Sequence, residues 1–232
     1  MILLALDSTA VVATAALMKD GEILASEIVN CGKTHSETLL PLIEELYQRT
    51  GISPKDTDVY ACSVGPGSFT GVRIGTAIIK GMAFGQKPCV GISTLEALAV
   101  NLVSMNGIIA PVMDARREQV YNALFRCENG VLTRLTPDRI IILSELQKEL
   151  SAYGEPIYFC GDGYALAQEY IAHPEKKETP DALISQNGES VAKVAYREYL
   201  SGHYVSDSEL RPVYLRLPQA ERERNEKLKQ TT

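Results

Sequence analysis

The sequence of 232 residues lacks the cysteine pattern of a disulfide-rich or zinc-binding protein. Its cysteines are odd in number and scattered, and none forms a C-x-x-C pair, which argues against a disulfide framework and a cysteine-rich zinc site. Four of the five lie in or beside apolar runs, so we expect small buried hydrophobic residues there. The cysteines are Cys31, Cys62, Cys89, Cys127 and Cys160.

Positive charge and long apolar runs are scarce as well. The 23 Lys and Arg residues are outnumbered by 29 Asp and Glu residues, for a net charge of −6, and no Lys/Arg run stands out. This average lacks the basic footprint of a nucleic-acid-binding domain, although it leaves room for a local patch. No stretch reaches the roughly 18 apolar residues of a membrane span. Residues 1–21 do not fit a signal peptide, since no basic region precedes the apolar run and Asp7 interrupts it. We therefore expect a cytoplasmic protein without membrane contact.

Familiar catalytic motifs are missing. The three histidines, His35, His173 and His203, form no H-x-x-x-H pair, and no G-x-S-x-G elbow or G-x-x-x-x-G-K-[ST] loop occurs. These absences disfavour a zinc peptidase, a serine hydrolase and a P-loop nucleotidase, and we expect no metal site.

Hydrophobic patterning instead predicts alternating strands and helices in two halves. In the first half, Lys19-Asp20-Gly21 signals a hairpin turn and a helix start is expected at Ser36. The second half has an Asn-Gly turn at 129–130. Expected strands are 2–7, 11–21, 22–29, 58–65, 88–93, 107–114, 118–130, 131–141 and 156–163. Expected helices are 36–50, 71–85, 94–105, 143–154, 164–173 and 189–202.

Each half follows the order strand, strand, strand, helix, strand, helix, and each first strand ends on an aspartate, Asp7 or Asp114. We interpret this as an internal structural repeat, in which two copies of one α/β unit face each other across a cleft. The expected lobes are residues 1–105 and 106–217. Residues 218–232 are charged and without apolar pattern, so we expect a flexible, solvated tail.

A glycine-rich segment, GPGSFTG, lies between an expected strand and an expected helix. Glycine permits positive φ and lets other groups approach the backbone, and a strand–turn–helix offers N–H groups to an anion or to a partner. A tight structural turn is the alternative. The candidate residues of this signature loop are Gly65, Pro66, Gly67, Ser68, Phe69 and Thr70.

The helix that follows is apolar nearly all round, which indicates burial on more than one side. An internal glycine costs a helix about 1 kcal/mol relative to alanine, so Gly75 and Gly81 need a compensating reason, such as close approach by another helix. Arg73 in the first turn opposes the helix dipole. We expect it to be paired with a carboxylate or held for a ligand or partner.

Two facing lobes of this topology suggest a nucleotide-binding fold related to actin and the sugar kinases. Such proteins hold phosphates in glycine-rich hairpins after the first strand of each lobe. The matching segments here, 7–13 and 114–120, keep their aspartates and lack the glycines. We expect weak nucleotide binding or none, with no cofactor held tightly by this chain alone. The candidate nucleotide-binding residues are Asp7, Ser8, Thr9 and Asp114.

Five segments together carry a family resemblance: CSVGPGSFTGVRIG (62–75), HSETLLPLIEELY (35–47), DARREQVY (114–121), CGDG (160–163) and PVYLR (212–216). Over about residues 1–217 the chain resembles the TsaB (YeaZ) family of bacterial tRNA threonylcarbamoyladenosine biosynthesis proteins. The resemblance implies an α/β, two-lobed actin/sugar-kinase/Hsp70-like fold. It also implies a non-catalytic relative of TsaD, which transfers the threonylcarbamoyl group to the adenosine beside the anticodon of tRNAs that read A-starting codons.

The resemblance further implies partners and an interface. The partners are TsaD and the ATPase TsaE, a homodimer is compatible with the family, tRNA is reached only through the complex, and ATP or ADP is expected at most at the complex interface. Replacing Gly75 by a bulky residue should then block pairing and leave the chain folded. An autonomous sugar-kinase-like phosphotransferase or ATPase is the main alternative; a metallopeptidase, suggested by an old family label, is the weaker one. The implied interface residues are His35, Leu39, Leu40, Ile43, Gly71, Arg73, Gly75, Ile78 and Met82.

Overall fold

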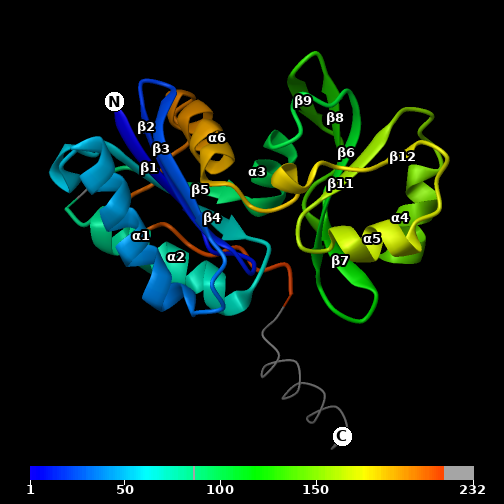
Figure 1. Cartoon of the computed structure of the whole chain (residues 1–232), viewed down its shortest axis with the longest axis horizontal. Helices are drawn as coiled ribbons and strands as arrows, with labels where there is room; N and C mark the ends of the chain where they lie inside the picture. Colours follow the sequence, from blue (N-terminus) through cyan, green and yellow to red (C-terminus); the bar gives the residue numbers. More distant parts are fainter. Residues whose placement is uncertain (86, 217–232) are drawn as a thin grey trace, which may run out of the picture.

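The computed structural model describes residues 1–85 and 87–216, so the expected tail at 218–232 lies outside the described residues. Figure 1 shows two lobes side by side, each built on a sheet with helices packed against it. The strands of the first lobe are β1 (Ile2–Asp7), β2 (Ala13–Lys19), β3 (Glu22–Val29), β4 (Val59–Gly65) and β5 (Cys89–Ser93). The helices from this half of the chain are α1 (His35–Thr50), α2 (Phe69–Met82) and α3 (Thr94–Val100).

The second half of the chain supplies the other sheet. Its strands are β6 (Gly107–Asp114), β7 (Gln119–Asn122), β8 (Phe125–Glu128), β9 (Val131–Arg134), β10 (Arg139–Ile142), β11 (Ile157–Cys160) and β12 (Lys176–Lys177). Its helices are α4 (Leu143–Leu150), α5 (Tyr164–Tyr170) and α6 (Gly188–Leu200). Within the described residues no helix is both long and apolar enough to cross a membrane.

Strand order confirms the internal repeat. The first sheet runs β3-β2-β1-β4-β5 and the second β10-β7-β6-β11-β12, so the two orders agree position by position. In each sheet the central strand, β1 or β6, pairs antiparallel with the next strand and parallel with β4 or β11. The fold is therefore the expected duplicated α/β unit.

Two predicted strands of the second half were wrong in extent, because each is broken into two pieces. The expected strand 118–130 lies along β6 in a single register, with Asn122 opposite Val112 and Phe125 opposite Ile109. The break between β7 and β8 falls opposite Pro111, which has no N–H to continue the ladder. The expected strand 131–141 likewise divides into β9 and β10, around a segment that contains Pro137.

Helix limits follow capping chemistry. Helix α1 begins one residue before the expected Ser36, because Thr34 is the N-cap and Glu37 completes a capping box. It ends at Gly51, whose φ of 67° lies in the left-handed region. Helix α2 begins at Phe69 rather than 71, because the side chain of Ser68 accepts a hydrogen bond from the Gly71 N–H. The helix expected at 94–105 ends at Val100.

The two faces of the first sheet are covered by helices from both halves of the chain. Helices α1 and α2 pack on one face, in the cluster that contains Leu39 and Ile79. The other face is covered by α6, through Val191 and Ala195, although α6 follows the whole second sheet in the chain. Figure 1 shows α6 beside β1–β3 and α3 between the lobes. Helices α4 and α5 contribute to the core of the second lobe.

A network of charged side chains also joins the lobes. Glu96 of α3 accepts hydrogen bonds from Arg134 of β9, at 2.8 Å, and from Arg197 of α6, at 2.5 Å. Beside it, Ser93 donates to Asp138 across 2.5 Å. The lobes are therefore held together by polar contacts as well as by α3.

Candidate functional site

The signature loop packs against the hairpin that follows β1. The Ser68 N–H donates to the carbonyl of Thr9 at 2.7 Å. A Cβ atom on Gly67 would lie 2.5 Å from the same carbonyl oxygen, so only glycine permits this approach. The signature loop therefore packs closely on the backbone of the first hairpin at Thr9.

Glycines of α2 continue this contact. A Cβ atom on Gly71 would overlap the Ser8 carbonyl, and one on Gly75 would lie 2.5 Å from the Ser8 hydroxyl oxygen. That hydroxyl donates to the Gly71 carbonyl at 2.8 Å. Close approach explains Gly75, as expected, and also Gly71, but the neighbour is the chain's own hairpin and not another helix. The reasoning behind a bulky Gly75 variant that folds and fails only to pair was therefore wrong.

Gly81 is the exception on this helix. It is exposed, and a Cβ atom there would meet no atom within 4 Å in the described structure. Its cost to helix stability is not offset by packing within the chain. Gly81 is the glycine of α2 that leaves room for an outside group.

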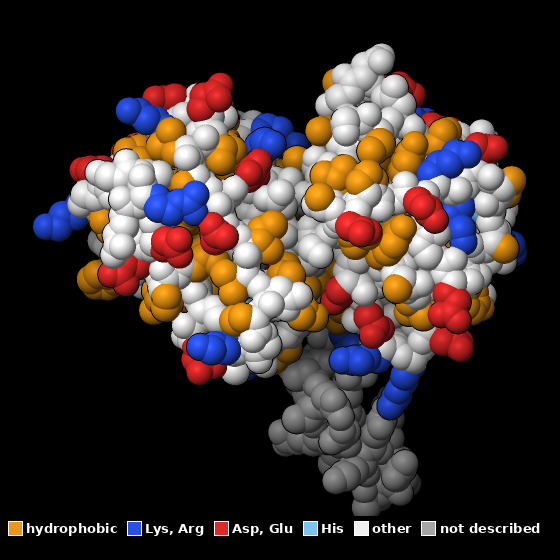
Figure 2. Space-filling view, viewed as in Figure 1, with side chains coloured by type: hydrophobic (Ala, Val, Ile, Leu, Met, Phe, Trp, Pro, Cys, Tyr) orange, Lys and Arg blue, Asp and Glu red, His pale blue; other side chains and the backbone are white. Residues whose placement is uncertain are grey.

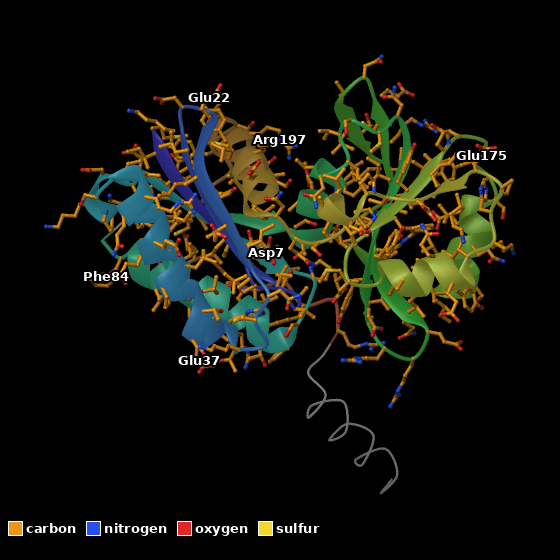
Figure 3. All side chains as sticks on the ribbon, viewed as in Figure 1. Asp7, Glu22, Glu37, Phe84, Glu175 and Arg197 are labelled. Atoms are coloured by element: carbon orange, nitrogen blue, oxygen red, sulfur yellow. The ribbon has the colours of Figure 1, made fainter. Side chains whose placement is uncertain are left out.

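Asp7 is fully buried at the end of β1. Its Oδ1 accepts hydrogen bonds from the Thr9 N–H and hydroxyl, both at 2.7 Å. Among the described residues Oδ2 has no hydrogen-bond partner, and neither has the Ser63 hydroxyl. Burial raises the pKa of Asp7, although the hydrogen bonds from Thr9 oppose the rise. Figure 3 shows Asp7 at the inner end of the first sheet, near the junction of the lobes.

A cavity of about 390 Å³ lies between the lobes. Of the four candidate nucleotide-binding residues, Thr9 and Asp114 line it, whereas Asp7 and Ser8 do not. The full lining is Thr9, Ala10, Val11, Gly67, Ser68, Met113, Asp114, Ala115, Arg116, Tyr121, Asp162 and Arg216.

Asp162 of the CGDG segment is a cavity residue that the sequence reasoning missed. Its carboxylate accepts a hydrogen bond from the Asp114 N–H at 3.1 Å. Desolvation raises the pKa of Asp162, and the charge of Asp114 adds to the rise. Since β6 and β11 are parallel neighbours, the segment after each reaches the same edge, and that rule could have found Asp162. Within the residues that the structure describes, no group of three His, Cys, Asp or Glu side chains is placed to hold a metal.

Arg73 is held by aromatic side chains. Its guanidinium lies 3.9 Å from the centroid of the Phe69 ring, and its Nε–H donates to the Tyr214 hydroxyl at 3.0 Å. Phe69 and Tyr214 are stacked, with centroids 4.4 Å apart. Arg73 forms no ion pair in the described part of the chain, so the expected carboxylate partner is not found there. Tyr214 lies in the PVYLR segment of the family resemblance, but the sequence reasoning did not name it as a site residue.

The residues of the implied interface divide by exposure. Leu39, Ile43, Gly71 and Gly75 are buried within the first lobe, and Ile78 and Met82 are half-buried. The ring Nε2 of His35 lies 2.7 Å from the Ala10 carbonyl oxygen, which holds the start of α1 against the first hairpin. Only Leu40 and Arg73 of the nine are fully at the surface.

Apolar side chains are exposed on the helical side of the first lobe. Phe84 is 84% exposed just beyond α2, and Leu40 is 53% exposed on α1. Figure 3 shows Phe84 at the outer side of the first lobe, and Figure 2 shows hydrophobic side chains at the surface of this lobe. An apolar cavity of about 640 Å³ opens here, lined by Leu40, Ile43, Glu44, Tyr47, Gln48, Gly51, Ile52, Ser53, Pro54 and Met82. Exposed apolar surface next to a cavity is typical of a docking site.

Fold and site together define a two-lobed protein of the actin/sugar-kinase/Hsp70-like class in which the signature loop packs against the first hairpin. The structure of component A of (R)-2-hydroxyglutaryl-CoA dehydratase from Acidaminococcus fermentans has a similar fold, with a TM-score of 0.51 at 13% identity. The superposition covers 86% of this chain and 99% of the component A chain.

Closer relatives give the family. The family model described as TsaD, tRNA N6-adenosine threonylcarbamoyltransferase, matches residues 24–223. The tRNA threonylcarbamoyladenosine biosynthesis protein TsaB of Bacillus subtilis (strain 168) is 33% identical over 74% of this chain and 75% of its own length. TsaB of Escherichia coli (strain K12) is 30% identical over 92% of this chain and 94% of its own length. The chain belongs to the TsaB (YeaZ) family. YeaZ from Pseudomonas aeruginosa superimposes with a TM-score of 0.79 at 26% identity, covering 92% of this chain and 99% of that one.

Proposed function

We propose that the chain is a non-catalytic subunit in threonylcarbamoyladenosine formation on tRNA, which pairs with a TsaD-class transferase and activates it. The relatives named TsaB support the process, and the match to the TsaD family model supports kinship with the transferase. The observation that carries the pairing is the exposed apolar face of α1 and α2. We call it the pairing face, and define it by Leu40, Ala77, Gly81 and Phe84.

The chemistry of the pairing face fits a helical partner. Ala77 and Gly81 lie four residues apart on the exposed side of α2, so a second helix can approach its backbone closely. Leu40 and Phe84 supply apolar area around them. The TsaD family model matches residues 24–223, which include α1 and α2, so we expect equivalent helices in the transferase and two like faces that meet about an approximate twofold axis. The same geometry accommodates a homodimer, which the transferase would displace.

A non-catalytic role is supported by the first hairpin. Asp7 is buried and absent from the cavity lining, so its carboxylate is withdrawn from any phosphate or metal in the cavity. The signature loop packs on the carbonyl of Thr9, although Thr9 still lines the cavity. We place ATP or ADP at most at the interface of the complex, with TsaE docking on the assembled pair and tRNA reaching the chain only through that complex.

Light scattering of the chain with TsaD from the same organism tests the proposal. A 1:1 heterodimer is expected. Gly81→Arg should abolish it without lowering the melting temperature, because the new side chain meets open space in the lone chain and arginine favours the helix more than glycine does. Lys193→Glu, on the exposed face of α6, is the control and should pair normally. Full pairing by Gly81→Arg would refute the pairing face, and absence of any heterodimer with the unaltered chain would refute the proposed function.

The second candidate is an autonomous phosphotransferase or ATPase, and the inter-lobe cavity with Asp114 and Asp162 is the observation in its favour. Two carboxylates at the cavity wall could orient a bound cation and phosphate. Sustained ATP turnover by the lone chain, lost in Asp114→Asn, would establish it. If ATP hydrolysis is no faster with the chain than without it, the second candidate is refuted and the role as a partner subunit is the remaining one.

A further inference from the structure

The connection between β6 and β7 has a backbone that ordinary side chains rarely adopt. Arg116, Arg117 and Glu118 have φ values of 68°, 57° and 58° in succession. Single left-handed residues occur in turns, but three consecutive non-glycine residues are unusual because Cβ and carbonyl oxygen are crowded in each. Such conformations persist only where surrounding contacts enforce them, and they concentrate at functional sites.

The surrounding contacts are present at each step of this turn. The Asp114 carboxylate accepts a hydrogen bond from the Arg116 N–H at 2.7 Å. The Ala115 N–H donates to the Gln119 carbonyl at 2.9 Å, and the Leu143 N–H donates to the Glu118 carbonyl at 3.0 Å. The Arg216 guanidinium donates to the Ala115 carbonyl and to the Gln119 side chain from a distant part of the chain. The turn is thus a built feature and not a loose loop.

Its effect is to hold two arginine side chains in solvent. Arg116 is 86% exposed, and its nearest carboxylate oxygen, on Asp114, lies 3.7 Å away. Arg117 is exposed and forms no ion pair in the described ranges 1–85 and 87–216. With Arg216 at the base of the turn, three arginines lie together, and the carboxylates of Asp114, Glu118 and Asp162 lie at or beside the same turn. Figure 2 shows Lys and Arg side chains at the lower end of the second lobe, where Figure 1 places the connection from β6 to β7.

We propose that the 115–118 turn binds phosphate groups of the tRNA backbone. Arginine forks match phosphate oxygens in pairs, and rigid presentation reduces the entropy lost on binding. Arg116 and Arg216 line the inter-lobe cavity, whereas Arg117 lies outside it, so the exposed pair of Arg116 and Arg117 suits successive phosphates of a strand better than one nucleotide within the cavity. An acidic segment of a protein partner is a less favoured ligand for the turn. The pairing face proposed for the protein partner lies on the first lobe, whereas the turn lies on the second. The choice of tRNA as the RNA rests on the proposed function.

The test is fluorescence anisotropy of a labelled, unmodified tRNA transcript, titrated with the full chain alone and in complex with TsaD at several salt concentrations. R116Q/R117Q should weaken binding about tenfold or more at low salt and reduce the salt slope by about 1 to 2, since each lost phosphate contact releases fewer counterions. K148Q/K193Q removes the same charge from exposed helix surfaces and should change the affinity less than about twofold. R116K/R117K retains the charge without the fork and should lie between them.

The outcomes separate this proposal from the others. Equal weakening by both Gln pairs would mean that only net charge matters and would overturn it. So would absence of tRNA binding by the unaltered chain in both forms, or a loss confined to ATP binding, which would assign the phosphate to a nucleotide. Light scattering with TsaD distinguishes a protein partner from tRNA. Lost pairing in R116Q/R117Q would assign the turn to a protein partner, whereas intact pairing with lost tRNA binding supports the proposal.

Discussion

At the scale of single residues, Asp7 is an ionisable side chain that is fully buried, so the protein environment disfavours its charged form. Its Oδ1 is satisfied by Thr9, but its other oxygen and the neighbouring Ser63 hydroxyl have no partner in the described structure. An ionised carboxylate in this position lacks the solvation that it has in the unfolded chain, so burial raises the pKa of Asp7. This candidate nucleotide-binding residue is therefore an interior group in the structure.

Asp7→Asn should therefore stabilise the protein at neutral pH. The amide keeps the acceptor for Thr9 and brings a donor for the Ser63 hydroxyl, so a gain of about 1–3 kcal/mol is expected, the cost of one unsatisfied buried group. Because the folded pKa lies above the unfolded one, the wild type loses stability as pH rises through that window, and the gain should shrink toward acid pH.

Urea unfolding at pH 7.5 and pH 5 measures this difference. Asp181→Asn, at an exposed position, is the matched control and should change stability little at either pH. A destabilised Asp7→Asn protein at neutral pH would show that the ionised carboxylate is held favourably.

At the scale of elements, the sequence predicted the turns, because adjacent residues determine them. The hairpin at Lys19-Asp20-Gly21 and the Asn-Gly turn at 129–130 were confirmed, and Asp20 and Asn129 both have the positive φ of such turns. The break opposite Pro111 could not be predicted without the register of β6 against its neighbour, because strand pairing is non-local. The partner of Gly75 was misjudged for the same reason, since Ser8 lies far away in the chain.

Helix α2 offers a paired test of this interpretation. Gly81→Ala should raise the free energy of unfolding by up to about 1 kcal/mol, through helix propensity alone. Gly75→Ala should lower it by about 1–3 kcal/mol, because the new methyl group overlaps the Ser8 hydroxyl and strand β1.

Denaturant unfolding of the two variants beside the wild type measures both values. The chemical change is identical, so only the surroundings differ. Equal effects at Gly75 and Gly81 would contradict the contact between α2 and the first hairpin.

At the scale of the whole molecule, Glu96 joins three elements from both lobes. Burial would raise its pKa, but hydrogen bonds and charges from Arg134 and Arg197 outweigh burial and hold the pKa of Glu96 below its ordinary value. A lowered pKa means that this stability is present at neutral pH and is lost as pH falls through the folded pKa.

Glu96→Gln should therefore cost about 1 kcal/mol at pH 7, and the cost should shrink as pH falls below the ordinary glutamate pKa and through the lower pKa of the folded state. Thermal unfolding across this pH range measures the loss, with Glu145→Gln as an exposed control. A constant difference at all pH values would show that packing, and not charge, accounts for the role of Glu96.

The return of α6 to the first sheet bears on how the chain is made. Leu3, Ala5, Ala16 and Met18 form a face that α6 covers, and α6 is synthesised only after the whole second sheet. During translation the first lobe therefore emerges with one apolar face of its sheet exposed. Its core is completed only when residues near 200 leave the ribosome. A polypeptide cut at residue 105 inherits the same exposed surface, so the halves of this duplicated fold are mutually dependent in assembly even though each has its own sheet.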